Sequence, residues 1–335
     1  MMYLHRLLAG FLMVGLLAGL TVPAAVGQEK DKEKPKEKDT APAAKAPGDK
    51  PGDKAPEAKP AEDKGEKVSL KWKFEKDKVF YQKMVTKTVQ TMKVMNNDVN
   101  QTQNQTFYFA YKPVKMEGDK ATIEQKIIGV AMDIEIGGSK ISYDSTKDTT
   151  ASNPLGDFFK ARVDSTFTIT YDTKLNKVTG VEGRDGFIQK LAAANPQMKP
   201  LLEVILIADA LKEMAEPTFA LVPNKEVGKA EKWARNTKLD MGPIGKYDNE
   251  YTYTYEGAEG QGDKQMQKIK VDTVLKYSEP GEVAGQGGLP FKIKKANLKS
   301  SSPGGQVLFS SAKGRLEKSN TKIELKGDLN IEIGG

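Results

Sequence analysis

From Val68 onward, hydrophobic and polar residues alternate along much of the chain with a period of two, which is the pattern of strands that bury one face. In YTYTYEG, for example, Tyr251, Tyr253 and Tyr255 fall on one side and threonines on the other. The same alternation predicts further strands in TFYFAYKPV (106–114), IIGVAMDIEIGG (127–138, with Ile128 and Val130 on the apolar side), FTITYDT (167–173), KIKVDTVLKY (268–277) and KIELKGDLNIEI (322–333). One-sided strands of this kind are typical of antiparallel sheets that cover a core on one face only.

The predicted strands are long, and short turn signals separate them: EGD at 117–119, GGS at 137–139 and SPGG at 302–305. We therefore expect a mainly β (α+β) fold, with long antiparallel strands that form a curved sheet or an open barrel. The pattern leaves open whether residues 68–183 and 218–335 form one β unit or two.

One segment, residues 184–216, has the longer period of helices and forms a helical excursion from the β pattern. Pro196 and Pro200 divide it, and the second predicted helix begins after Pro200. Its apolar residues recur at helical spacing: Leu201, Leu202, Ile205, Ala208 and Leu211. Two interpretations stay open. This helix is either a core element on the concave face of the sheet, or a lid whose five residues contact a lipid or another apolar ligand.

The chain begins with the pattern of a secretory signal peptide, predicted to span residues 1–27. Its uncharged stretch, residues 7–20, is too short to span a bilayer as a helix. The small residues that follow predict cleavage between Gly27 and Gln28, with cleavage after Ala24 or Ala25 as the alternative. The protein is therefore expected to be exported, to the periplasm or the extracellular space, with no transmembrane span after cleavage.

Residues 28–67 have the composition of a disordered linker. Lysine and acidic residues occur there in equal numbers among Pro, Ala and Gly, and no aliphatic residue is larger than Ala. Such a segment cannot bury enough apolar surface to offset the loss of chain entropy. We expect a mixed-charge, low-complexity spacer, followed by one β-rich domain over residues 68–335.

Composition excludes several chemistries. The chain has no cysteine, and its single histidine, His5, lies in the predicted leader. A mature chain without His or Cys has no Ser-His-Asp or Cys-His catalytic arrangement and no zinc, haem or copper site built on those ligands. We predict no catalytic, cofactor-binding or metal-ligating residue and no lipoprotein anchor. A carboxylate-based hydrolase stays open, because carboxylate pairing depends on three-dimensional structure.

Charge and local motifs add little chemistry. The formal net charge of +7 comes mostly from lysines that alternate with acidic residues, and this argues against a nucleic-acid partner. The segment from Asp98 to Thr102 begins like a calcium loop but lacks its Gly and Glu, so we interpret it as an Asn- and Gln-rich loop between two strands. Trp72 and Trp233 are either core anchors or sugar-stacking platforms.

The stretch FALVPNKEVGKAEKW, residues 219–233, resembles the entry to the second β section of an uncharacterised (domain-of-unknown-function) family of exported bacterial proteins. Leu70–Trp72 and the Gly-rich segment before QVLFSSAKGRLEKS are similar as well. The chain departs from the family pattern at Ala230–Lys232, where an acidic residue followed by Ser or Thr is expected. The resemblance implies export and a β-rich fold of unknown function over roughly residues 68–335, and it transfers no catalytic residue.

Together these features favour a non-enzymatic protein of the cell envelope. Its β-rich domain, carried on a flexible spacer, is expected to bind an apolar or polymeric ligand, such as a lipid, or an envelope protein. The alternatives are a structural envelope component without a ligand and a carboxylate-based hydrolase of envelope polysaccharide.

Overall fold

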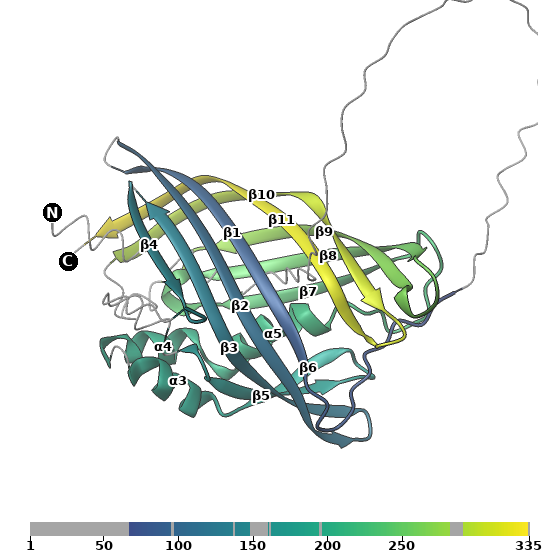
Figure 1. Cartoon of the computed structure of the whole chain (residues 1–335). Coiled ribbons are helices and arrows are strands. Elements are labelled where there is room, and N and C mark those ends of the chain that lie inside the picture. Colours follow the sequence, from purple (N-terminus) through teal and green to yellow (C-terminus); the bar gives the residue numbers. More distant parts are fainter. Residues whose placement is uncertain are drawn as a thin grey trace, which may run out of the picture.

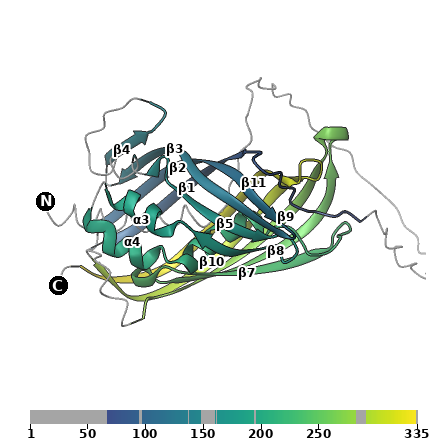
Figure 2. The same ribbon diagram turned by 90° about the horizontal axis from the view of Figure 1, so that it is seen from below.

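The computed structural model describes residues 67–94, 97–136, 138–147, 160, 162–193, 196–281 and 291–333. Over these residues, long antiparallel strands form two sheets that face each other, with short helices along one side (Figures 1 and 2). The predicted mainly β fold with a helical excursion is therefore confirmed. The predicted leader, its cleavage site at Gly27 and Gln28, and nearly all of the predicted linker lie outside the described residues.

In the described part of the chain, the first sheet has six strands in the order β1-β2-β3-β5-β6, with β4 paired to β3. All neighbouring pairs are antiparallel. Its strands are β1 (Phe80–Val94), β2 (Asn97–Glu117), β3 (Lys120–Ile136), β4 (Ser139–Asp144), β5 (Thr166–Asp172) and β6 (Lys177–Glu182). β1, β2 and β3 are long hairpin-connected neighbours and form most of this sheet (Figure 1).

The second sheet contains five described strands in the order β11-β10-β9-β8-β7, again antiparallel throughout. They are β7 (Lys232–Asp240), β8 (Lys246–Glu259), β9 (Met266–Ser278), β10 (Phe291–Ser310) and β11 (Arg315–Ile333). Short 3₁₀ turns lie at Gly242–Ile244 and Gly262–Lys264. The β residues before and after the helical excursion thus form two sheets rather than one.

The helical excursion consists of α3 (Arg184–Ala193), a 3₁₀ turn (Pro196–Met198), α4 (Lys199–Ile205) and α5 (Ala208–Phe219). The segment that the sequence predicts to be one helix after Pro200 is interrupted at Leu206 and Ile207, and α5 begins beyond the break. α5 packs against β6 of the first sheet and β7 of the second. It therefore joins the two sheets along one edge. Within the described residues, no helix combines the length and the apolar character needed to cross a bilayer.

A segment at the start of the domain, residues 68–74, connects the two sheets at one end and is called the N-terminal strap here. Val68 pairs with Val227 in an isolated antiparallel bridge, and the Lys73 N–H donates a hydrogen bond to the Gly314 carbonyl at 2.9 Å. The strap places Leu70 and Trp72 in the core. The core itself lies between the sheets and under the helices, because the inner face of almost every strand is apolar.

Three local predictions are wrong in instructive ways. Ile128 is 41% exposed, because a β-bulge opposite Tyr108 and Phe109 turns Ile127 to the core in its place. The SPGG segment is not a turn: it lies within β10, where the register shifts between Ser301 and Gly304. The predicted Asn- and Gln-rich loop at 98–102 is the first part of β2. In each case strand pairing with a neighbour overrides the local signal.

Candidate ligand-binding site

The inner face of β2 changes character halfway along the strand. Phe107, Phe109 and Tyr111 are buried in the hydrophobic core. Since alternate residues of a strand share a face, the same inner face carries Gln101, Gln103 and Gln105, which we call the glutamine row; each of these side chains is 1% exposed. The outward neighbours Thr102, Asn104 and Thr106 are more exposed. A run of buried glutamines on the core face of a strand is unusual, because amides are mostly found at protein surfaces.

The glutamine row is only partly hydrogen-bonded. Gln101 Nε2 donates to Gln103 Oε1 at 3.2 Å. Within the described part of the chain, Gln101 Oε1, Gln103 Nε2 and both amide atoms of Gln105 are buried without a partner. A buried polar atom left without a partner costs about 1–3 kcal/mol. Four such atoms would therefore cost roughly 4–12 kcal/mol, comparable with the whole stability of a typical domain, about 5–15 kcal/mol. The row has hydrogen-bonding capacity suited to a bound molecule.

Polar and apolar strips lie side by side next to this row. On β1, Thr86, Thr88 and Gln90 are paired with Gln105, Gln103 and Gln101 and extend the polar strip toward the edge of the sheet. On β3, the paired residues are Met132, Ile134 and Ile136, which we call the apolar row; all three are buried. The inner face of β1–β3 thus presents amides beside aliphatic side chains, which is the surface chemistry of a site for an amphipathic molecule.

The glutamine row lies far from the tightly packed end of the molecule. Just after the N-terminal strap the chain reaches β2 near Pro113, whose carbonyl accepts a hydrogen bond from the Asp77 N–H. Eight residues of strand separate Pro113 from Gln105, a distance of roughly 27 Å. At the strap end, Trp72, Phe74 and Phe219 contact one another, with ring centroids 5.3–6.4 Å apart. Aromatic residues fill the interior at the strap end of β2, whereas the amides of the glutamine row lie toward the other end of β2.

Arg162 lies where the aromatic part of the inner face of β2 meets the glutamine row. Its guanidinium carbon is 5.7 Å from the centroid of the Phe107 ring. Phe107 is the inner-face residue of β2 that follows Gln105. Burial lowers the pKa of Arg162 to about 10, so the side chain keeps its positive charge at neutral pH. A cation over an aromatic face is a favourable contact. The sequence pattern around Arg162 gives no sign of this burial.

The helix residues predicted to contact an apolar ligand are divided by the fold. Leu201, Leu202 and Ile205 on α4 and Leu211 on α5 are buried in the core, whereas Ala208 begins α5 and is exposed. The four leucine and isoleucine side chains share one packed cluster with the inner faces of both sheets. This arrangement favours the interpretation of α4 and α5 as core helices and moves the candidate site to β1–β3.

Both tryptophans serve as anchors for the chain that follows α5. Five successive carbonyls of this segment each accept a hydrogen bond from a side chain: Phe219 from Trp72 and Tyr171, Ala220 from Arg235, Leu221 from Trp233, Val222 from Arg235 and Pro223 from Asn176. These bonds satisfy buried backbone groups that no strand or helix supplies with partners. The FALVPN stretch is thus a structural connection, and Trp72 and Trp233 help to hold it in place.

The buried carboxylates are engaged in backbone contacts as well. Among the described residues, the acidic side chains in the buried class are Asp172 and Glu216. Asp172 Oδ1 accepts hydrogen bonds from the N–H groups of Lys174 and Leu175, and Glu216 Oε2 accepts one from Val178 at 2.6 Å. Burial raises the pKa of Glu216 to about 7, and Glu213 adds to the shift. These carboxylates fasten turns and strands, which gives the hydrolase hypothesis no observation in its favour.

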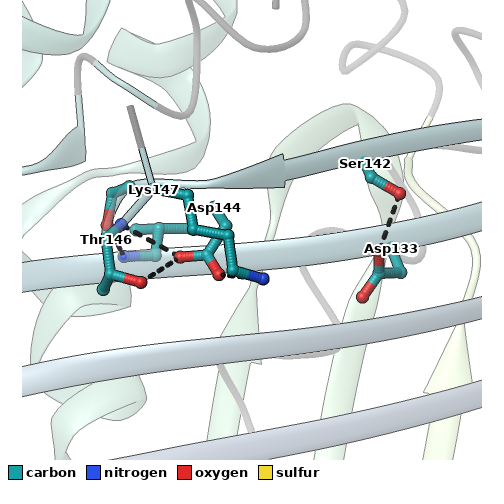
Figure 3. Close-up of polar contacts among 7 residues, drawn as sticks. Asp133, Ser142, Asp144, Thr146 and Lys147 are labelled. Carbon is teal, nitrogen blue, oxygen red and sulfur yellow. Dashed lines mark hydrogen bonds and ion pairs between the residues drawn. The ribbon is translucent and has the colours of Figure 1, made fainter. Parts of the chain in front are cut away.

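A polar turn after β4 illustrates how the surface carboxylates behave (Figure 3). Asp144 Oδ1 accepts hydrogen bonds from the backbone N–H and the hydroxyl of Thr146, and its other oxygen pairs with Lys147 at 3.3 Å. These contacts hold the pKa of Asp144 below its usual range. Nearby, the Ser142 hydroxyl donates to Asp133 at 2.7 Å. The described residues contain no group of three or more acidic, His or Cys side chains placed to hold a metal ion.

Fold and site together define a β-rich domain with two facing antiparallel sheets and an inner surface on which amides lie beside aliphatic side chains. Residues 118–281 match the model of a family of unknown function (DUF6263). This match confirms the expected resemblance to an uncharacterised family, over the segment from the β2–β3 turn to the end of β9. No match to the chain was found among curated proteins or among solved structures. The glutamine row lies outside the matched segment.

The glutamine row was not predicted, although the sequence contains the signal for it. Gln101, Gln103 and Gln105 continue the same alternation as Phe107 and Phe109, with one face kept through QTQNQTFYF. Polarity led to the prediction of a loop, because polar stretches between strands are usually turns. The alternation itself predicts one continuous strand whose inner face becomes polar.

Proposed function

We propose that this protein is a non-enzymatic binding protein of the cell envelope, which takes up an amphipathic ligand against the inner face of β1–β3. One observation carries the proposal. The glutamine row, with four buried amide atoms that have no partner among the described residues, lies directly beside the apolar row of Met132, Ile134 and Ile136. The amides would bind the polar part of the ligand, and the apolar row would bind its hydrocarbon part.

The rest of the chain supports this assignment. The carboxylates of the described core hold backbone groups, and the mature chain predicted from the sequence has neither His nor Cys. The predicted signal peptide and mixed-charge spacer in front of the domain suit an exported carrier. The spacer would leave the folded domain free to reorient and meet its ligand.

The first experiment is native mass spectrometry of the mature protein, purified without detergent from the cells that produce it and followed by organic extraction. The expected result is a mass above that of the polypeptide, with the excess recovered as a lipid or a similar amphiphile. The Gln306→Met variant, altered at an exposed position of β10, serves as a matched control and should retain the excess mass. A bare polypeptide mass that stays bare after incubation with lauric acid and with dodecyl maltoside would contradict the proposal and favour a structural protein without a ligand.

A further inference from the structure

The two faces of the first sheet differ in charge as well as in hydrophobicity. Outward positions carry lysines and acidic residues: Lys83, Lys87, Asp133, Glu135 and Lys140. The inner positions around the glutamine row carry uncharged side chains throughout the described residues: Thr86, Thr88, Gln90, Met132, Ile134, Ile136 and Tyr143. A charged ligand head bound at this surface would lose its hydration without gaining an opposite charge from these strands.

Among the described residues, the unpartnered atoms of the glutamine row include both hydrogen-bond donors and hydrogen-bond acceptors. Gln101 Oε1 and Gln105 Oε1 are acceptors, whereas Gln103 Nε2 and Gln105 Nε2 are donors. A group that matches such a surface must both donate and accept hydrogen bonds. Hydroxyls and amides do this, whereas a carboxylate only accepts and an ammonium only donates.

The length of the row limits the size of the group. Alternate residues of an antiparallel strand are separated by about 7 Å, so Gln101 and Gln105 lie about 14 Å apart along β2. A single hydroxyl cannot bond to all three amides over this distance. A head with several hydroxyl or amide groups, such as a sugar, can.

We propose that the ligand has an uncharged head with several hydroxyl or amide groups, as in a glycolipid, and that the glutamine row is its specificity-determining surface. This inference rests on the proposed function. Donors and acceptors of the row bond to the head, while the apolar row contacts the first part of the hydrocarbon chain. Arg162 is a buried charged side chain over the Phe107 ring, at the end of this surface, and it defines the rival hypothesis of an anionic head.

The test compares three amphiphiles that share a twelve-carbon chain and differ in their heads: dodecyl maltoside, lauric acid and dodecyltrimethylammonium. Binding to the delipidated protein is measured by titration calorimetry below the micelle-forming concentration of each compound. Two or three net hydrogen bonds correspond to at least about a tenfold change in affinity. We expect dodecyl maltoside to bind at least about tenfold more tightly than either charged compound.

The decisive variant replaces Gln101, Gln103 and Gln105 by Met, which keeps the side-chain length and removes the hydrogen bonds. It should lose at least about tenfold in affinity for dodecyl maltoside, while its affinity for lauric acid changes less than about twofold. The matched control replaces three exposed glutamines by Met, Gln261, Gln265 and Gln306, and should bind all three compounds as the wild type does. If the triple variant does not fold, Gln105→Met replaces it; this change breaks no side-chain hydrogen bond within the described residues and should still lose several-fold in maltoside affinity.

The outcomes separate the two proposals. If none of the three compounds binds to the wild type, the proposed function fails and this inference fails with it. If all three bind with similar affinity, or if the Met variants keep the maltoside preference, the uncharged-head inference alone is overturned. Tightest binding of lauric acid, lost in Arg162→Gln, would establish the anionic alternative.

Discussion

The carboxyl of Glu216 should make the protein less stable as the pH rises through neutrality, and Glu216→Gln should remove this effect. Glu216 lies near the end of α5, is 9% exposed and accepts the Val178 N–H at 2.6 Å. Burial raises its pKa from 4.5 to about 7, Glu213 adds to the rise, and Lys177 and Arg235 oppose it. A glutamine at this position keeps an oxygen that accepts the same hydrogen bond and carries no charge to bury.

The magnitude follows from the pKa difference. Each pKa unit corresponds to about 1.4 kcal/mol, so a shift from 4.5 to about 7 gives about 3 kcal/mol. Between these two values the folded protein holds a proton that the unfolded chain has released. The contribution of Glu216 to stability is therefore fully present below about pH 4.5 and is lost as the pH rises through about 7. At pH 8, Glu216→Gln should be up to about 3 kcal/mol more stable than the wild type, a rise in Tm of roughly 6–12 °C.

The assay is urea unfolding of wild type and variant at pH 5 and at pH 8, followed by circular dichroism. The control is Glu226→Gln, because Glu226 is exposed and its replacement should leave the pH dependence unchanged. The difference between Glu216→Gln and wild type should be small at pH 5 and large at pH 8. An equal difference at both values, or a variant that loses stability at pH 8, would refute the reasoning, because the hydrogen bond to Val178 would then outweigh the burial of charge.

Three further predictions concern packing and the glutamine row. Gly314→Ala should destabilise the protein by at least about 2 kcal/mol, because a Cβ at Gly314 would collide with Lys73 of the strap; Gly118→Ala, at a similar positive φ with open space around it, measures the backbone cost alone, and equal losses in urea unfolding would contradict the collision. Arg235→Lys should cost about 2–3 kcal/mol in the same assay, since a lysine cannot reproduce the fork that binds the carbonyls of Ala220 and Val222, and an unchanged midpoint would argue against this anchoring role. Gln105→Met in the delipidated protein should leave stability unchanged or raise it by about 1–3 kcal/mol, because both amide atoms are unpartnered among the described residues; a clear loss would show that the amide is structural.

The strands themselves could be predicted from the sequence, because alternation is a local property of the backbone. Tyr251, Tyr253 and Tyr255 lie on one inner face as expected, and so do Ile269 and Val271. The helical excursion was predicted for the same reason. Where a neighbouring strand intervenes, the local pattern fails: the bulge in β3 exposes Ile128 and buries Ile127, and no feature of that strand alone specifies the bulge.

The sequence by itself determined that this is a mainly β protein whose predicted mature form has no histidine or cysteine chemistry. Only the tertiary structure decided which polar residues are buried. Alternation places Gln101, Gln103 and Gln105 on one face of a strand, but burial depends on what lies opposite, and that is set by two sheets formed from distant parts of the chain. The same holds for Glu216, whose pKa is raised by the elements packed around it.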